Sequence, residues 1–244
     1  MKKLLSIVLV CILIVKYPFI VDAGSEIEEY LRRSGMPEYV IEQLSEMQKE
    51  TIYNEIIGCE VTYSSFHSEG LEFSNGGVSN CSTISTADLT ITVVAYDATK
   101  NGEECTMLFP SFKWNTPVKI QNDVFAYALY SGWEAMEDES LSVWIYNVNG
   151  EKVQSSVQSP ETVSESGNAY KFQDIGFLQG IYEGNGVFYA KQKETDATRI
   201  LCINYTHDKT SSKSLSYSIS IGPVQVSVSP SSSDYDSLSG RYSF

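Results

Sequence analysis

The sequence predicts a mainly β protein, an antiparallel β-sandwich preceded by a small N-terminal helical region. Two observations support this fold class. From residue 59 onward, short segments alternate apolar and polar side chains with a period of two, which is typical of strands with one buried face. Turn residues separate these segments and no long helical pattern lies between them, so neighbouring strands are expected to pair antiparallel in two packed sheets.

Residues 1–23 have the pattern of a secretory signal peptide. A basic start precedes an apolar run from Leu4 to Val15, and Val21-Asp22-Ala23 ends the segment with small residues at the two positions that matter for cleavage. The apolar run has about 12 residues, fewer than the ~20 needed to span a bilayer, and Lys16 and Pro18 keep it from continuing into residues 19–21. An uncleaved membrane anchor is therefore the less favoured alternative, and the protein is predicted to be secreted or extracytoplasmic.

The chain is strongly acidic. Its formal net charge is −14, and removal of residues 1–23, which hold three Lys and one Asp, would leave −16. Nucleic acid and anionic membrane surfaces would repel such a chain, so neither is expected as a partner. The charge is compatible with cationic ligands, with Ca²⁺, or simply with solubility outside the cell.

Residues 24–57 form the predicted helical region. In its first part, apolar residues recur at helical spacing, and Met36-Pro37 begins a second element because Pro is favoured in the first turn of a helix. Ser45 followed by Gln48 is a capping-box pattern, which predicts a third short helix. Three short helices bury little apolar surface alone, so they are expected to pack on the β-domain or on one another.

The β-sandwich domain is assigned to residues 58–226. Its centre is the run from Val124 to Tyr130, which carries almost nothing polar and predicts a strand buried on both faces. One hairpin connection contains Asn101-Gly102, and another turns at Asn149-Gly150, where Asn-Gly supplies the positive φ of a type I′ turn. Residues 227–244 are predicted to be a Ser-rich tail or an edge strand. The remaining strands are expected at residues 61–66, 89–96, 105–112, 141–148, 151–157, 169–173, 180–191, 198–207 and 215–221.

Four cysteines lie after the signal segment, namely Cys59, Cys81, Cys105 and Cys202. In an oxidising compartment they permit two disulfides in three possible pairings, among which the sequence does not choose. The alternative is free, buried thiols, for example Cys202 within an apolar run. No Cys-x-x-Cys is present and the two His residues are isolated, so a zinc site is not expected.

Several short motifs succeed one another along the chain. Trp114-x-x-Pro117 precedes Asn122-Asp123 and an apolar strand that ends in Gly132-Trp133. The later part holds Asp174-Ile-Gly-Phe177, Tyr182-x-Gly184 and Asn204-Tyr-Thr-His207 before an alternating Ser-rich strand. This arrangement, over residues 85–230, resembles a loosely defined group of uncharacterised secreted proteins of Gram-positive bacteria with a predicted β-sandwich domain. The resemblance implies an exported bacterial protein with that fold. No activity is known for the group, so no catalytic residue is implied by it.

The sequence predicts that the protein is not an enzyme. It lacks a Gly-x-Ser-x-Gly elbow, and the better candidate base, His207 beside Asp208, is more simply a strand-end His before a polar turn. Glycoside hydrolysis would need two carboxylates across a cleft, for which Asp174 and Glu183 are candidates. Acids are so abundant in this chain that their presence discriminates nothing, so a glycan-active hydrolase is the less favoured alternative.

A Ca²⁺ site is the one cofactor prediction. Asp97, Asn101, Glu103 and Glu104 would lie in one loop and would supply the hard oxygen ligands that Ca²⁺ prefers. Their spacing does not match an EF-hand loop. The alternative is that Asp and Asn serve turn geometry, as they commonly do.

The predicted function is that of a non-catalytic binding or surface-interaction module. Trp114 beside a turn and Trp144 in a strand are the candidate ligand-binding residues, because exposed aromatic rings stack on sugars, although core packing is the commoner fate of a strand Trp. The expected partner is a carbohydrate or a cell-surface protein. The alternative is an exported module of the immunity or stress type that binds one protein partner through the helical region.

Overall fold

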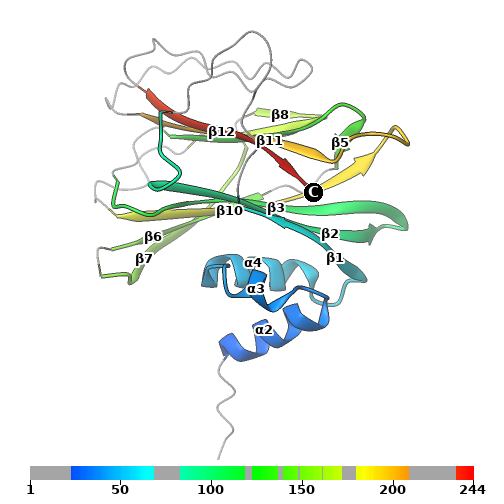
Figure 1. The fold of residues 1–244 in the computed structure, drawn as a ribbon, viewed down its shortest axis with the longest axis horizontal. Helices are drawn as coiled ribbons and strands as arrows, with labels where there is room; N and C mark the ends of the chain where they lie inside the picture. The colour runs from blue at the N-terminus through cyan, green and yellow to red at the C-terminus, as the bar shows by residue number, and fades with distance from the viewer. Residues whose placement is uncertain are drawn as a thin grey trace, which may run out of the picture.

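Two antiparallel sheets packed face to face form the body of the protein, which confirms the predicted fold class (Figure 1). The structure is a computed structural model that describes residues 23–68, 83–118, 123–136, 140–147, 149–160, 162–171, 180–208 and 235–244. The predicted signal segment up to residue 22, Cys81 and the predicted strand at 215–221 lie outside the described residues. None of the described helices is long and apolar enough to cross a membrane.

The first sheet has seven strands. Its main path runs in the order β1 (Val61–His67), β2 (Leu89–Lys100), β3 (Glu103–Trp114), β10 (Ile181–Gln192), β6 (Ser140–Tyr146) and β7 (Lys152–Gln158). The short strand β5 (Trp133–Ala135) pairs with the end of β10. β10 is therefore the strand that joins the β1–β3 part of the sheet to the β6–β7 part.

The second sheet has five strands, in the order β12 (Tyr235–Ser243), β11 (Ile200–Asp208), β4 (Val124–Leu129), β9 (Gly167–Lys171) and β8 (Thr162–Ser164). All residues of β4 are buried, as predicted for a strand covered on both faces. Successive side chains of a strand point to opposite faces, and β4 supplies two clusters in this way. Phe125, Tyr127 and Leu129 enter the space between the sheets, whereas Val124, Ala126 and Ala128 pack with Ala169.

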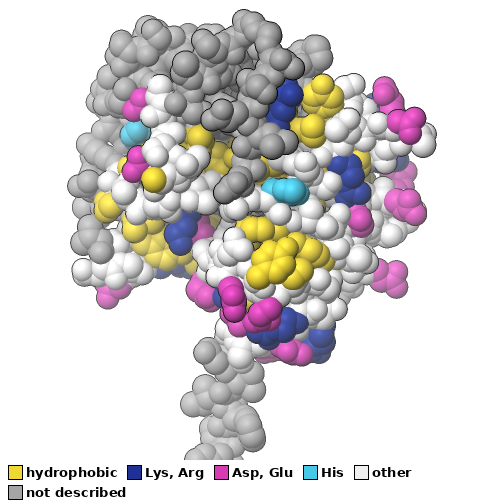
Figure 2. Space-filling model, viewed as in Figure 1, with side chains coloured by type: hydrophobic (Ala, Val, Ile, Leu, Met, Phe, Trp, Pro, Cys, Tyr) yellow, Lys and Arg dark blue, Asp and Glu magenta, His cyan; other side chains and the backbone are white. Residues whose placement is uncertain are grey.

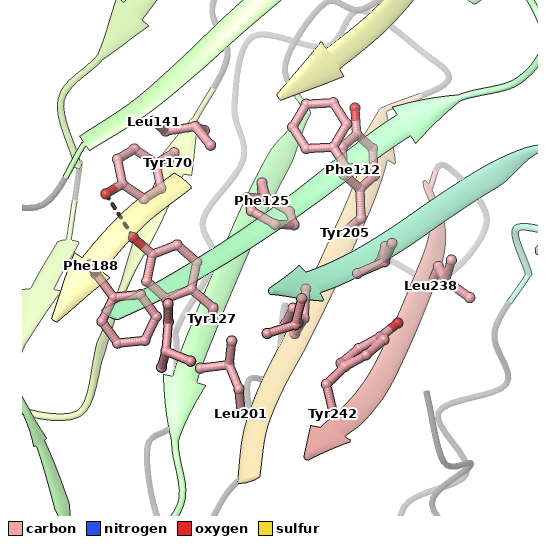
Figure 3. Packing of buried hydrophobic residues seen from close by; sticks show 14 of the residues in the cluster. Phe112, Phe125, Tyr127, Leu141, Tyr170, Phe188, Leu201, Tyr205, Leu238 and Tyr242 are labelled. Atoms are coloured by element: carbon pink, nitrogen blue, oxygen red, sulfur yellow. Dashed lines mark hydrogen bonds between the residues drawn. The ribbon is translucent and has the colours of Figure 1, made fainter. Parts of the chain in front are cut away.

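Aromatic rings fill much of the space between the sheets (Figure 3). Tyr127 of β4 stacks on Phe188 of β10, with ring centroids 4.7 Å apart, and so joins the two sheets. Its hydroxyl lies 3.0 Å from the Tyr170 hydroxyl of β9, so these two buried phenols are hydrogen-bonded to each other. Rings of this size stabilise the sandwich strongly, because hydrophobic stabilisation scales with the apolar area removed from water.

Three short helices cover the outer face of the seven-stranded sheet (Figure 1), namely α2 (Ala23–Arg33), α3 (Glu38–Ile41) and α4 (Glu46–Ile56). The predicted capping box begins α4: Ser45 accepts a hydrogen bond from the Gln48 N–H, and the Gln48 side chain accepts one from the Ser45 N–H. Apolar side chains form a second core between the helices and the sheet. It consists of Leu31, Met36, Val40, Ile41, Leu44, Ile52 and Ile56 from the helical layer and Val94, Tyr96, Met107, Phe109 and Val187 from the strands.

Ion pairs contribute to the contact between helices α2 and α4. The Lys49 ammonium of α4 lies 2.6 Å from the Glu28 carboxylate of α2 and 3.1 Å from that of Glu46. Lys49 is only 8% exposed, so water and salt screen these pairs less than they screen surface pairs. Figure 2 shows acidic and basic side chains next to one another over this layer. Helices α2 and α4 are thus held together as a unit.

The β2–β3 connection is shorter than predicted. Asn101 and Gly102, with φ of 55° and 82°, form all of it, as expected for a two-residue hairpin turn with positive φ at both positions. β2 therefore runs to Lys100, and β3 begins at Glu103. Residues 97–104, predicted as a loop, lie mostly in strands, and their polar character reflects exposure at the ends of long strands.

The β6–β7 hairpin is confirmed, but its predicted turn type is wrong. β6 pairs antiparallel with β7. The Gly150 N–H donates to the Asn147 carbonyl at 2.9 Å, so the turn closes across residues 147–150, and Gly150, with φ of 80°, is not one of its two central residues as the type I′ prediction requires. A longer loop is closed by the Asn147 N–H, which donates to the Glu151 carbonyl at 2.9 Å. The Asn147 side chain also accepts from the N–H groups of Asn149 and Glu151.

Candidate functional site

An open cleft with a volume of ≈ 1220 Å³ lies at one end of the sandwich, where the β2–β3 hairpin meets the β10–β11 connection. We call it the end cleft. β2, β3 and β10 have 12 residues each and are longer than any described strand of the facing sheet, so part of their length has no facing strand among the described residues. The cleft is lined by residues 59–62, 97–99, 103–106, 133, 191–195 and 199.

The end cleft carries more acidic than basic side chains. Five carboxylates and three basic groups line it. Each basic group is paired with a carboxylate, namely Arg199 with Asp97 at 2.7 Å, Lys191 with Glu103 at 2.7 Å and Lys193 with Glu134 at 2.8 Å. Among the lining residues, the exposed carboxylates that remain outside these pairs are those of Glu60, Glu104 and Glu194. The cleft therefore presents surplus negative charge to water.

Arg199 makes several contacts with other residues that line the end cleft. Its Nη2 donates to Asp97 at 2.7 Å and to the Thr106 hydroxyl at 3.2 Å, so it ties the start of β11 to the facing sheet. Its guanidinium lies 5.8 Å from the Trp133 ring and 5.4 Å from the Phe244 ring, within the range of cation–π attraction. The sequence prediction did not include Arg199, although a single Arg directly before an apolar strand was the available signal.

The structure brings three of the four predicted Ca²⁺ ligands into the end cleft. Asp97, Glu103 and Glu104 line it, whereas Asn101 lies in the hairpin turn. The carboxylates of Asp97 and Glu103 are each engaged by a basic side chain, which competes with a metal for the same oxygens. In the part of the chain that the structure describes, no three His, Cys, Asp or Glu side chains gather as a metal site.

Three of the four cysteines lie in the described residues, and their thiols are free. Cys59 is exposed and Cys105 is buried, and both line the end cleft, while Cys202 is buried in β11. Burial raises the pKa of Cys202 to about 11 and also raises the pKa of Cys105. Both buried thiols therefore stay protonated and unreactive, since the thiolate is the reactive form. Cys202 thus follows the alternative of a free, buried thiol.

The two predicted ligand-binding tryptophans have different fates. Trp114 is not an exposed platform, because it is only 4% exposed and its indole N–H donates to the Tyr205 hydroxyl at 3.0 Å. Two residues apart on one strand, Phe112 and Trp114 share the face that points into the sandwich. Trp144 is half-buried on the outer face of β6, and the Lys152 ammonium lies 3.4 Å above its ring. Ligand binding by Trp144 stays a prediction.

A buried polar network joins β4, β11 and β3 around Asp123. Asp123 is fully buried, and its carboxylate accepts hydrogen bonds from the Tyr205 hydroxyl at 2.7 Å, His207 Nδ1 at 2.9 Å and the Asp208 N–H at 3.2 Å. The sequence placed His207 with Asp208. Asp208 donates its backbone N–H to the Asp123 carboxylate, and its charge is a smaller cause of the raised pKa of His207. Asp123 is part of the motif at residues 114–133, but the sequence prediction gives it no site role, although an Asp directly before a fully apolar strand is a visible signal.

Among the described residues, this network holds no hydroxyl nucleophile that would complete a catalytic triad. Burial lowers the pKa of His207, but the hydrogen bond and the charge of Asp123 outweigh it and raise the pKa above its ordinary value. A Ser-His-Asp triad needs a nucleophile hydrogen-bonded to the second ring nitrogen. Among the described residues, Asp123 is the one side chain hydrogen-bonded to the His207 ring.

Replacing His207 by glutamine is expected to remove a contribution to stability that depends on pH. A His whose pKa is raised by folding stabilises the folded state fully below its unfolded pKa of about 6.5, and this contribution is lost as the pH rises through the raised folded pKa. The difference in free energy of unfolding between the wild-type protein and His207→Gln should therefore shrink as the pH is raised, measured by urea unfolding between pH about 5.5 and about 9. His67→Gln, in β1, is the matched control. A difference that grows with pH contradicts this expectation.

The two candidate glycosidase acids do not form a described pair. Asp174 lies outside the described residues. Glu183 is 1% exposed beneath α4, and the Ser45 hydroxyl donates to its carboxylate. Glu183 therefore does not line the end cleft.

Comparisons with known proteins assign no family to this chain. No protein-family model matches it, and no curated protein does. Among solved structures it is similar to a pore-forming protein, at 6% sequence identity and a TM-score of 0.32, over 74% of this chain and 87% of that chain. It is also similar to the enzymatically active domain of bacteriophage CBA120 tailspike protein 4, at 12% identity and a TM-score of 0.26, over 53% of this chain and 18% of that chain. With TM-scores this low, neither likeness supports an inference about the site.

Proposed function

We propose that the protein is an exported, non-catalytic binding module that holds a positively charged segment of a partner protein in the end cleft. The observation that carries the proposal is the charge balance of the cleft, where five carboxylates face three basic groups and each basic group is already paired with a carboxylate. A segment that bears Lys or Arg would find carboxylates outside these pairs. Complementary charge of this kind sets which partners bind and how fast they associate.

The size and surface of the end cleft favour a chain segment over a sugar. Small-molecule pockets commonly measure about 300–1,000 Å³, and this cleft, at ≈ 1220 Å³, is larger and open. Trp133, the aromatic side chain of its lining, is only 7% exposed and meets Phe244 edge-on with ring centroids 5.0 Å apart. It therefore offers no flat face on which a sugar ring could stack. Carbohydrate binding has less support at this cleft than protein binding.

Export and a non-catalytic role are the other two parts of the proposal. Export is supported by the signal-peptide pattern of residues 1–23. A non-catalytic role is supported by the way Asp123 and His207 are used, because the hydrogen bonds of the buried carboxylate all go to groups that position β11.

A Lys-rich peptide is expected to bind the end cleft, and removal of its surplus charge should weaken binding. The test variant combines Glu60→Gln, Glu104→Gln and Glu194→Gln, which keeps side-chain size while it removes three negative charges. Exposed charge pairs contribute about 0.2–1 kcal/mol each, so the variant should bind oligolysine about tenfold more weakly than the wild-type protein. Fluorescence anisotropy measures both affinities, and the difference should diminish at high salt because exposed charges are screened.

The matched control combines Glu26→Gln, Glu42→Gln and Glu50→Gln, the same change of charge at exposed positions of the helical layer. This control should bind oligolysine as the wild-type protein does. Equal weakening in both variants would show that net charge alone attracts the peptide and would remove the end cleft from the proposal. Retention on an insoluble glycan without peptide binding would support the carbohydrate alternative instead.

A further inference from the structure

The contact between α4 and the seven-stranded sheet is mostly apolar but contains a group of buried polar side chains. Strand register places Thr92, Ser111 and Asn185 side by side on β2, β3 and β10. The Gln48 amide of α4 donates to the hydroxyls of Thr92 at 2.7 Å and Ser111 at 2.5 Å, and these two hydroxyls are themselves 2.5 Å apart. Specific hydrogen bonds therefore seat α4 on the sheet in addition to apolar contact.

Glu183 and Asn185 lie on the same face of β10 beneath α4, and each is 1% exposed. The hydroxyl of Ser45, the N-cap of α4, donates to one carboxylate oxygen of Glu183. The other oxygen, and both amide atoms of Asn185, are buried without a hydrogen-bond partner among the described residues. Buried polar groups are nearly always hydrogen-bonded, so burial of these atoms opposes docking of the helix.

Ionisable groups face Glu183 from both neighbouring strands, and acidic groups of α4 act on one of them. Lys113 is its register partner in β3, Tyr146 interacts with it from β6, and Glu46 and Glu50 of α4 interact with Tyr146. Burial raises the pKa of Glu183, and the hydrogen bond from the helix N-cap, the Lys113 charge and Tyr146 lower it by less. Docking of α4 thus favours the protonated carboxyl group.

We propose that the helical layer is a pH-dependent cover, in which ionisation of Glu183 loosens α4 from the seven-stranded sheet and protonation seats it. In the undocked state, water would solvate the Glu183 carboxylate and the Asn185 amide. Undocking would also expose the apolar sheet face under the helices, formed by Val94, Tyr96, Met107, Phe109 and Val187. The cover is separate from the end cleft, because no residue of α4 lines that cleft.

The direction of the pH dependence is set by which state holds the proton. The docked state binds the proton more tightly than the undocked state, in which Glu183 takes the ordinary Glu pKa of about 4.3. Docking is therefore strongest below that pH. As the pH rises from there to the raised pKa of the docked state, the undocking equilibrium constant should increase by up to about tenfold per pH unit and then level off.

Hydrogen exchange of the full chain between pH about 4 and about 8 tests the proposal. The readout is the protection of α4 amides, corrected for intrinsic exchange rates and compared with amides of β4 and β11. We expect α4 protection to fall with rising pH relative to these reference strands. Glu183→Gln should abolish this relative change, because its side chain does not ionise. Glu42→Gln, at an exposed position beside α3, is the control and should keep the wild-type pH dependence.

Ser45→Ala gives a second variant that keeps the carboxyl group. Ser45→Ala removes a hydrogen-bond donor to the ionised carboxylate, so the pKa of Glu183 in the docked state should rise further. The fall in α4 protection should therefore extend to higher pH. The missing helix cap should add a loss of protection that does not depend on pH. Two results would overturn the proposal. One is wild-type α4 protection that does not change with pH relative to the reference strands, and the other is a pH-dependent change that persists in Glu183→Gln.

Discussion

Replacing Asp123 by alanine is expected to lower the free energy of unfolding by about 3–5 kcal/mol, the effect of removing one partner from a buried charged network. The fully buried carboxylate accepts hydrogen bonds from the Tyr205 hydroxyl, from His207 and from the Asp208 N–H. Without the Asp123 carboxylate, three hydrogen-bond donors near the C-terminal end of β11 have no acceptor. Urea unfolding followed by tryptophan fluorescence measures the loss, and Trp114, whose ring lies 5.2 Å from that of His207, reports on this region.

Asp97→Ala is the matched control for this prediction. The Asp97 carboxylate also pairs with a basic side chain, at 2.7 Å, but it is exposed, so its removal should cost about 1 kcal/mol or less. The loss of unfolding free energy in Tyr205→Phe should lie between those of Asp123→Ala and Asp97→Ala, at about 1–3 kcal/mol, because this change removes a hydroxyl that also accepts from the Trp114 indole. An Asp123→Ala effect no larger than that of Asp97→Ala would contradict the network.

Replacing Phe112 by alanine is expected to cost about 3–5 kcal/mol of unfolding free energy, as for other buried aromatic residues. The Phe112 ring centroid lies 5.1 Å from that of Phe125 and 4.8 Å from that of Tyr205, so it fills the space where β3 faces β4 and β11. It also covers Gly184 of β10, where a Cβ atom would lie 2.2 Å from the ring. Gly184→Ala should therefore cost about 1–3 kcal/mol through overpacking.

The two changes should be strongly non-additive, which a double-mutant cycle measures by denaturant unfolding. In the Phe112→Ala background, the methyl group of Gly184→Ala enters the space that the ring vacated and should cost little or nothing. Gly186→Ala is the matched control on the same strand, because its added Cβ would meet Pro110 instead. Two results would show that the Phe112 ring does not set the packing at Gly184. One is that the unfolding free energies lost in Gly184→Ala and Phe112→Ala simply add in the double variant. The other is that Gly186→Ala has the same coupling energy with Phe112→Ala as Gly184→Ala has.

Local signals in the sequence predicted the elements well. The capping box at Ser45 and the apolar run that became β4 each specify a structure through residues close in the chain. Trp114 was placed wrongly because the nearby turn was given more weight than the period of two, which puts it on the same face as Phe112. The alternation of side chains along β3 therefore itself predicts a buried Trp114.

The candidate sites depend on contacts between distant segments, and these could not be predicted. Asp123 and His207 meet only because β4 and β11 are neighbours in one sheet. The end cleft draws on segments between residues 59 and 199, so its charge balance appears only in three dimensions. Residues 97–104 resembled a metal-binding loop because the exposed ends of long strands have the same polar composition as loops, although the Asn101-Gly102 turn inside them was identified correctly.

The central place of β10 has a consequence for the order in which the chain folds. β10 comes many residues after both of its main neighbours in the chain, since Ala190 pairs with Thr106 of β3 and Gly186 pairs with Leu141 of β6. While the chain is being made, β3 and β6 each keep one strand edge without its final partner until β10 is available. Pairings between distant segments form slowly, and open strand edges promote aggregation in the interval. For the seven-stranded sheet, the vulnerable period therefore lasts at least until residue 192 has been added to the chain.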